Sequence, residues 1–329
     1  MKLRVLFVGD NHISARTPAN RKDNYLEATL NKLKDCMQIG IDHKVDAIVL
    51  LGDVFDTREE GPLARNGALN ILKNQEDGSA WPFPVYVVVG NHDIQSSFSL
   101  DKSSLGTLVN AGVLEKTDYV ENLGIAFAHF TPELDENIKN GFLSNTPAVI
   151  WACHASIVDV PDPRFADKLV VFDDIPLHEN TKMVISGHIH HPMSKIRNDG
   201  AIFVNPGAIG RYSASKDNLS RDLKVFLLTY DLDGVIYKQD YLYLPSAQHY
   251  SEVFKMDQIN LAKEQKKEAK EFVKKITLIQ NNNWAHTVLD DRLSALRTFG
   301  EKKNVEKEVI DVAVEELRLA NLDLKSEEE

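Results

Sequence analysis

Five short clusters of Asp, Asn and His residues, each beside a short apolar run, constrain this chain of 329 residues more than any other feature. In chain order they are Asp10-Asn11-His12, Asp53-Val54-Phe55-Asp56, Asn91-His92-Asp93, Cys153-His154 and His188-Ile189-His190. Short runs rich in Val and Ile are typical of strands buried on both faces of a sheet. Open α/β sheets build their sites at the carboxyl ends of such strands. The clusters therefore predict one site assembled from several strand ends.

The apolar runs predict an α/β sheet domain over residues 1–245. The expected strands are 3–8, 47–51, 85–89, 125–128, 148–152, 183–185, 202–204, 225–230 and 235–242. Helices fit between the early strands, at about 20–39 and 63–74, and Asp231-Leu232-Asp233-Gly234 is typical of a hairpin turn. Four of the clusters directly follow a glycine, and we expect these glycines to let the backbone bend sharply after its strand.

The character of the chain changes after residue 245, so we expect a second region over 246–329. It is rich in Lys, Glu, Ala and Leu, and helices are expected at about 257–280, 284–299 and 302–322, with Gly300 at a stop. One apolar stripe follows helical spacing in the last helix, formed by Val305, Val309, Val312, Ala313, Leu317 and Ala320. These helices either pack on the sheet domain or form a docking surface for a partner, and the stripe fits both.

Composition constrains the cellular location and the binding partners that we expect for the chain. Only Cys36 and Cys153 occur, which argues against a disulfide framework and predicts a reducing, cytoplasmic location. No apolar run reaches the length of about 18 residues that a membrane helix needs. The net charge of −11 argues mildly against a protein that grips nucleic acid through a broad basic face of its own.

The residue types in the clusters suit divalent metal ions. Imidazole nitrogens and carboxylate oxygens favour Mn, Fe, Co or Zn, and the lack of cysteine ligands argues against a structural zinc site. Two cations about 3.5–4 Å apart need a bridging ligand, which a carboxylate with two oxygens provides. Asp53 is the natural bridge. Such a pair activates water and holds phosphate oxygens, so the pattern predicts hydrolysis of a phosphoester.

The ordered clusters resemble the calcineurin-like metallophosphoesterase family over about residues 1–245. Within it they are most similar to SbcD-type nuclease subunits of SbcCD DNA-repair complexes. The stretches that carry this similarity are 45–57, 90–93, 187–192 and 205–209, the last like a Pro-Gly turn of those nucleases. The resemblance implies an α/β fold, a metallophosphoesterase β-sandwich flanked by helices in four layers (αββα), followed by a helical C-terminal segment.

The resemblance also implies roles for individual residues. One metal would be held by Asp10, His12, Asp53 and His190, and the other by Asp53, Asn91, His154 and His188. His92 would be a catalytic histidine that contacts the scissile phosphate and assists the leaving group, with Asp93 orienting its ring. The two divalent ions would most often be Mn²⁺.

The function implied is a Mn²⁺-dependent DNA exo/endonuclease subunit that acts with an SbcC-like coiled-coil ATPase in DNA repair and recombination. A homodimer is compatible with it. The acidic net charge and the lack of a mixed α/β capping domain, in whose place about 84 helical residues are expected, favour an alternative. This alternative is a phosphatase or phosphodiesterase for a nucleotide or another small phosphoester. Asn11 stands where those nucleases commonly carry an aromatic residue, a departure that concerns a substrate contact and not the metal ligands.

Several further residues are expected to have no direct part in the site, or have two possible roles. His129 is expected to be structural, Cys153 to be buried in the core, and His191 to lie behind the ligands or at the surface. Arg211 and Lys216 follow the Pro-Gly turn, where they would either meet a phosphate backbone or be solvated loop charges.

Overall fold

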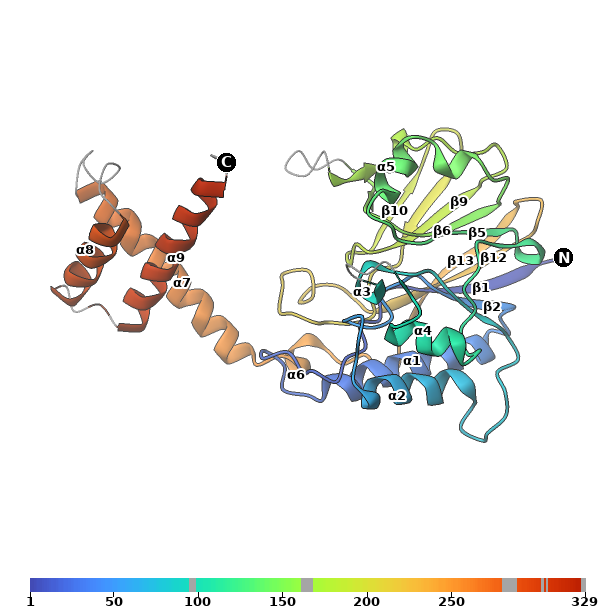
Figure 1. Cartoon of the computed structure of the whole chain (residues 1–329), viewed down its shortest axis with the longest axis horizontal. Helices are drawn as coiled ribbons and strands as arrows, with labels where there is room; N and C mark the ends of the chain where they lie inside the picture. The colour runs from blue at the N-terminus through green and yellow to red at the C-terminus, as the bar shows by residue number, and fades with distance from the viewer. Residues whose placement is uncertain (95–98, 161–167, 280–288, 303–304, 306, 327–329) are drawn as a thin grey trace. The chain divides into compact units, whose positions relative to one another are not determined.

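The computed structural model describes residues 1–94, 99–160, 168–279, 289–302, 305 and 307–326 (Figure 1). The chain forms two units, Met1–Phe254 and Lys255–Glu329. Residues 246–254 belong to the first unit because Ser246 donates its backbone and hydroxyl hydrogen bonds to Asp35, and Phe254 is fully buried. The division therefore lies later than the boundary expected after residue 245.

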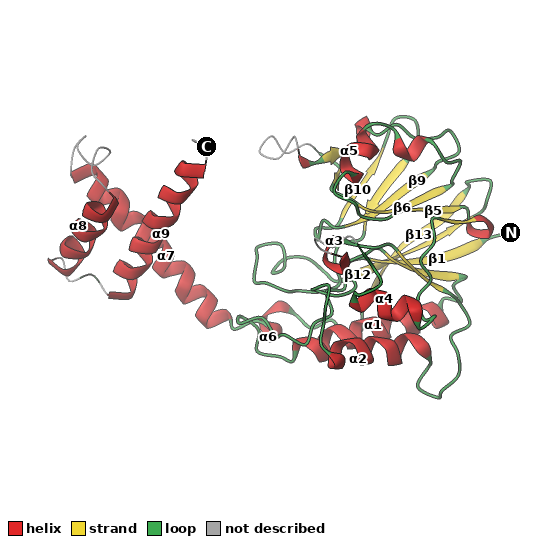
Figure 2. Cartoon of the chain, in the orientation of Figure 1, coloured by secondary structure: helices red, strands yellow, loops and turns green. Residues whose placement is uncertain are grey.

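The first unit is built from two sheets, with helices beside them (Figure 2). A five-stranded sheet has the order β13-β12-β1-β2-β3, and its members are β1 (Leu3–Val8), β2 (Ala47–Leu50), β3 (Val85–Val87), β12 (Lys224–Tyr230) and β13 (Ile236–Tyr243). The strands β1, β2 and β3 run parallel to one another, whereas β12 is antiparallel to β1.

A six-stranded sheet has the order β10-β11-β9-β6-β5-β4. Its members are β4 (Tyr119–Val120), β5 (Ile125–Ala128), β6 (Ile150–His154), β9 (Met183–Gly187), β10 (Met193–Ile196) and β11 (Ile202–Asn205). Here β5, β6, β9 and β11 are parallel. A small pair, β7 (Ile157–Val158) and β8 (Val170–Val171), lies outside both sheets.

Three apolar layers hold the unit together. Strand β1 contributes side chains to two of these layers. Val5 and Phe7 face the second sheet, while Leu6 and Val8 face the helices. The helices of the first unit are α1 (Tyr25–Asp42), α2 (Pro62–Lys73), α3 (Asn91–Ile94), α4 (Ser104–Asn110), α5 (Leu134–Lys139) and α6 (Tyr250–Val253). Helices α1 and α2 cover the first sheet, and α5 packs with the outer face of the second. The expected α/β fold class is confirmed.

All nine expected strands are present, with ends that differ by up to two residues. Four further strands, β4, β7, β8 and β10, were not expected. Three of them are only two residues long, and β10 contains Ser194 and Lys195, so none carries a continuous apolar run. Helix α1 begins at Tyr25, later than expected, because the side chain of Asn24 caps it by accepting a hydrogen bond from the Glu27 backbone.

The second unit is helical, as expected. It consists of α7 (Met256–Ile279), α8 (Leu289–Lys302) and α9 (Lys307–Ser326). Its core contains Ala269, Leu293, Leu296, Val309, Ile310, Ala313 and Val314. Two members of the expected stripe, Val309 and Ala313, lie in this core, and Val305 and Val312 pack against it. The side chains of Leu317 and Ala320, residues 280 and 284–288, and residues 303 and 304 lie outside what the structure describes.

Helix α8 runs through Gly300 and ends at Lys302, slightly beyond the expected stop. Among the described residues, none of the helices is long and apolar enough to cross a membrane.

Candidate metal centre

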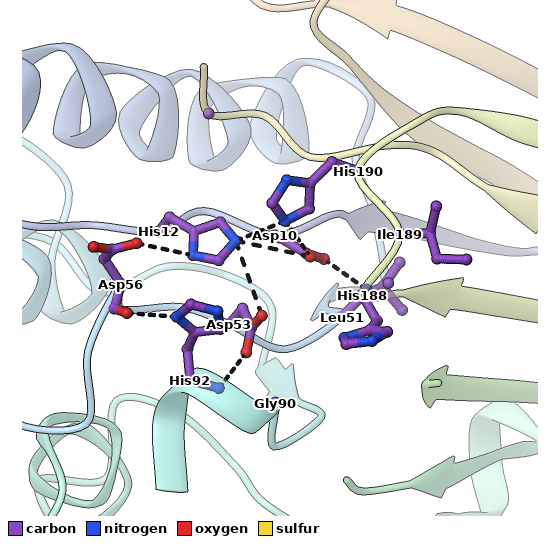
Figure 3. Close-up of polar contacts among 12 residues, drawn as sticks. Asp10, His12, Leu51, Asp53, Asp56, Gly90, His92, His188, Ile189 and His190 are labelled. Carbon is purple, nitrogen blue, oxygen red and sulfur yellow. Dashed lines mark hydrogen bonds and ion pairs between the residues drawn. The ribbon is translucent and has the colours of Figure 1, made fainter. Parts of the chain in front are cut away.

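The site forms where the carboxyl ends of parallel strands from both sheets meet (Figure 3). The first sheet contributes Asp10 and His12 after β1, Asp53 after β2, and Asn91 and His92 after β3. The second sheet contributes His154 as the last residue of β6, and His188 and His190 after β9. All the residues expected to bind metal are thus brought to one place.

Asp10, His12 and His190 form one group whose ligand atoms lie within 4.8 Å of one another. The Nε2 atoms of His12 and His190 face each other at 2.9 Å. The Oδ2 atom of Asp10 lies 3.4 Å from Nε2 of His190 and 4.0 Å from Nε2 of His12. Two imidazole nitrogens and a carboxylate oxygen therefore converge on one point.

A second group contains Asp53, His154 and His188, again within 4.8 Å. The amide oxygen of Asn91 joins it, because Oδ1 lies 3.0 Å from Nε2 of His154 and 3.0 Å from Nδ1 of His188. The Oδ2 atom of Asp53 is 3.4 Å from Nε2 of His154. The same oxygen is 3.9 Å from Nε2 of His12, so Asp53 lies between the two groups.

Contacts behind the imidazoles fix which nitrogen faces the centre. Nδ1 of His154 lies 2.7 Å from the carbonyl oxygen of Leu51, which turns Nε2 toward Asp53. Nδ1 of His12 lies 3.4 Å from Oδ1 of Asp56, an arrangement typical of metal-binding histidines that contact a carboxylate. Asp56 had no expected role. The sequence did mark this residue, because Asp56 is the second aspartate of the Asp53-Val54-Phe55-Asp56 cluster.

The turns that carry these side chains are conformationally strained. His12, Asp53 and His188 adopt positive φ values of 49°, 47° and 76°. Such left-handed conformations are costly for residues with a side chain and cluster at functional sites. Asp53 is stabilised there because its backbone oxygen accepts hydrogen bonds from the backbone N–H groups of both Asn11 and His12.

The glycines of the site act mainly through their lack of a side chain. Of the four before the clusters, only Gly52 has a positive φ, at 99°. A Cβ atom at Gly52 would lie 2.2 Å from Nδ1 of His154, and one at Gly90 would lie 2.2 Å from Oδ1 of Asp53. The expected sharp bend is thus specific to Gly52, while close packing of the site explains the others.

The electrostatics of the centre suit cations. Asp10 and Asp53 are each only 1% exposed, and Oδ2 of Asp10 accepts no hydrogen bond. Burial works to lower the pKa of His154, but the charge of Asp53, its hydrogen bond and the charge of Asp10 raise it to about 10. The same negative potential favours a metal ion, which takes the place of the proton on binding. The donor set of imidazole, carboxylate and amide groups therefore fits two divalent metal ions.

His92 lies at the edge of the centre, with its ring centroid 4.8 Å from that of His12. Its Nδ1 atom is 2.5 Å from the carbonyl oxygen of Asp56, a contact that directs Nε2 away from this loop. The expectation that Asp93 orients this ring is wrong. The Asp93 carboxylate is buried and accepts hydrogen bonds from the backbone N–H groups of Gly90 and Phe55, so it braces two loops. Burial and the nearby Asp53 charge raise its pKa to about 7.

Other histidines lie away from the ligand groups. His129 contacts the Val89 N–H and the Thr117 carbonyl, which is the structural role expected of it. His191 is exposed and lies 2.5 Å from Asp217. Cys153 faces the outer core of the second sheet, opposite to the centre, as strand alternation predicts. Arg211 fits neither alternative considered for it, because it is buried and donates to the backbone carbonyls of Asn218, Gln248 and Arg221.

Comparison with known proteins gives one family match. A family model described as calcineurin-like phosphoesterase matches residues 3–192. Similar solved structures include a dimetal phosphatase from Danio rerio, at 12% identity and a TM-score of 0.43, covering 74% of this chain and 99% of that chain. Another is Yfce, a phosphoesterase from E. coli, at 16% identity and a TM-score of 0.35, covering 73% of this chain and 100% of that chain. At these TM-scores neither structure informs the substrate of this chain.

The packing of Gly52 against His154 generates a prediction. We expect Gly52→Ala to displace the His154 ring and reduce the metal content of the purified protein, measured by elemental analysis. Gly78→Ala is the matched control, because Gly78 also has a positive φ, of 84°, but a Cβ atom there meets nothing within 4 Å. It should keep its metal and lose only about 1–2 kcal/mol of stability, the cost of a side chain in the left-handed region. Equal metal loss in both variants would contradict the steric explanation.

Proposed function

The chain belongs to the calcineurin-like phosphoesterase family, and from this premise we propose that it is a Mn²⁺-dependent DNA exo/endonuclease subunit working with an SbcC-like ATPase. The family identifies the chain as a metal-dependent hydrolase of phosphoester bonds, with a dinuclear site for divalent metals. DNA as substrate, manganese as metal and an ATPase as partner are the proposed refinements.

The two groups of converging donors support a ligand assignment. One ion would be held by Asp10, His12, Asp53 and His190. The other would be held by Asp53, Asn91, His154 and His188. Asp53 is proposed as the bridge because its Oδ2 atom lies within 4 Å of a nitrogen from each group. A metal pair of this kind supplies an activated water and a positive clamp on the phosphate oxygens.

The residues of the chain itself add positioning and proton transfer. His92 is proposed to contact the scissile phosphate through Nε2 and to protonate the leaving oxygen, since its Nδ1 atom is engaged by the Asp56 carbonyl. A positioned acid of this kind typically contributes 10²–10⁴-fold in rate. Asp56 is proposed as a positioning residue, because it contacts the ring of His12 and, through its carbonyl, the ring of His92.

The observation that carries the DNA proposal concerns two of the segments that resemble SbcD-type nucleases, 187–192 and 205–209. They lie together at the centre, because the Asn205 side chain donates to the Ile189 carbonyl at 2.7 Å. The Ala208 N–H donates to the His190 carbonyl, and the Ile209 N–H to that of Asp10. The similarity thus falls on residues that shape the metal centre.

The helical unit Lys255–Glu329 is the proposed docking region for the ATPase. Its helices bury a core of their own, in which Leu296 is 0% exposed. A region with its own core can present an outer surface to a coiled coil without drawing on the packing of the sheets.

A second candidate keeps the chemistry and changes the substrate to a nucleotide or another small phosphoester. Two observations favour it. One is the net charge of −11, and the other is that the described residues beyond Lys255, except Val305, are helical where a mixed α/β cap would follow.

The bridging role of Asp53 predicts the loss of both ions together. We expect Asp53→Ala to contain close to no metal by elemental analysis, because both ion positions lose a buried carboxylate. Asp46→Ala is the control, since Asp46 precedes β2 at its other end and its side chain accepts a hydrogen bond from the Arg4 N–H. An Asp53→Ala protein that still held two ions per chain would remove Asp53 from the bridge.

The role of His92 predicts a loss of rate without a loss of metal. With Mn²⁺ and end-labelled single- and double-stranded DNA, we expect His92→Ala to cleave about 10²–10⁴-fold more slowly than the wild type. The exposed His43 provides a control variant, His43→Ala, with unchanged cleavage. A small phosphodiester is assayed in parallel. Its turnover by a wild type that leaves DNA intact, with or without the ATPase, would select the second candidate.

The docking proposal predicts that a charge in the helical core abolishes partner binding. We expect Leu296→Asp to lose capture of an SbcC-like ATPase in a pull-down, while turnover of the small phosphodiester is unchanged. Thr298→Asp places the same charge on an exposed position of the same helix and should retain capture. Full capture by a Leu296→Asp protein with an unfolded helical unit would move the docking surface elsewhere.

A further inference from the structure

A cavity of about 190 Å³ in the first unit is lined by three buried basic side chains. It lies beside the first turn of α1 and the segment that leads out of β13, and Arg21, Lys32 and Arg211 border it. None of the proposed metal ligands is among its lining residues. The cavity is therefore separate from the metal centre.

Lys32 is the least compensated of the three. It is 4% exposed, and its Nζ donates to the Ala28 carbonyl of its own helix at 3.2 Å. Within the described part of the chain, no carboxylate lies within 4.0 Å of this ammonium group. Burial and the charges of Arg21 and Arg211 lower its pKa to about 8, against smaller opposing effects of the Asp23 and Asp35 charges. A buried ammonium without a direct ion-pair partner is costly, because it has lost its water and no carboxylate in contact replaces it.

The two arginines leave this positive charge largely in place. Arg211 is 7% exposed, and its three hydrogen bonds go to backbone carbonyls, which do not neutralise it. Arg21 is 3% exposed and is paired with Asp23 through bonds of 2.9 and 2.6 Å. It also donates to the backbone carbonyl oxygen of Arg211, and both residues line the cavity.

The remaining acidic residue of the lining, Glu27, is exposed to solvent. Among the described residues, the three buried cations therefore have one carboxylate within 4.0 Å, that of Asp23, whose side chain is 17% exposed. Several N–H donors of Lys32, Arg21 and Arg211 remain after the bonds above are counted, since an ammonium has three donors and a guanidinium five. A polar cavity of this size accommodates a group of several oxygen atoms.

We propose that this cavity, bordered by Arg21, Lys32 and Arg211, binds a small tetrahedral oxyanion of the phosphate class. Arginine offers a planar fork of donors that matches phosphate oxygens, and lysine acts as a point charge. The backbone of a nucleic-acid duplex does not fit, because cations exposed by only 3–7% lie too deep for a phosphate flanked by two sugars. The ligand is thus free phosphate or the terminal phosphate of a monoester.

Tyr25 connects the site to the metal centre. Arg21 lies over the ring of Tyr25 at 4.8 Å from its centroid, and the Tyr25 hydroxyl donates to the His12 carbonyl at 2.9 Å. The proposal itself rests on the residues of the cavity and does not depend on the nuclease function.

The test is a titration of the full-length, metal-free protein with inorganic phosphate, followed by calorimetry and by thermal unfolding. Removal of metal ions excludes phosphate binding at the dinuclear centre. We expect saturable binding to the wild type and a rise in its Tm. Lys32→Met should weaken binding at least about tenfold, because one charge-assisted contact is lost. Lys34→Met removes the same charge from an exposed position two residues along α1 and should bind phosphate like the wild type.

Two further arms complete the test. Lys32→Gln replaces the ammonium by a neutral polar group and guards against a folding defect in Lys32→Met, with far-UV circular dichroism as the check. A nucleoside 5′-monophosphate separates a monoester ligand, which would bind more tightly than phosphate, from free phosphate, which would bind equally well or better. No phosphate binding by the wild type, or equal binding by both Lys32 variants and the wild type, would overturn the proposal.

Discussion

Two carboxylates, Asp10 and Asp53, are buried side by side where the strand ends of the two sheets meet, and much of the unit is arranged around their charge. Within the described residues, the cationic groups close to them are imidazoles. Without a counter-ion, such a pair is costly to bury, because the charges repel each other and have lost their water. The arrangement is stable when protons or metal ions occupy the space between the carboxylates and the histidines. Binding of cations and stability of the fold are thus linked in this region.

This constraint explains why the backbone is strained at the same place. His12, Asp53 and His188 are held in left-handed conformations, and the side chains of His154 and Asp53 occupy the space left by Gly52 and Gly90. Such strain persists only when surrounding contacts fix it. The hydrogen bonds from Asn11 and His12 to the Asp53 carbonyl, and those that Asp93 accepts from Gly90 and Phe55, provide such contacts. Asp93 therefore contributes to the centre by holding loops, and its carboxylate accepts backbone hydrogen bonds in place of a contact with the His92 ring.

The first unit contains two centres of opposite charge. The metal centre gathers buried carboxylates and imidazoles. The cavity beside α1 gathers Arg21, Lys32 and Arg211 around one carboxylate partner, the half-buried Asp23. Each is poorly compensated by the chain alone, and each suits a small ion of the opposite sign. Tyr25 lies between them and contacts both. An excess of acidic residues over the whole chain thus says little about local binding, since the sign of the potential changes within one unit.

The sequence by itself determined the main strands, the fold class and the five clusters of polar residues that the fold brings together. Strand signals are local, because a continuous apolar run specifies burial on both faces, and polar residues at parallel strand ends must share one edge. Short or polar strands such as β10 were not predicted from the sequence, because their stability comes from neighbouring strands. The roles of Asp56, Asp93 and Arg211 were decided only by the tertiary structure, since each depends on which distant backbone group lies within hydrogen-bonding distance. The cavity around Lys32 could not be predicted from the sequence either. Its three cations are separated by up to 190 residues, and nothing in their spacing marks them as neighbours.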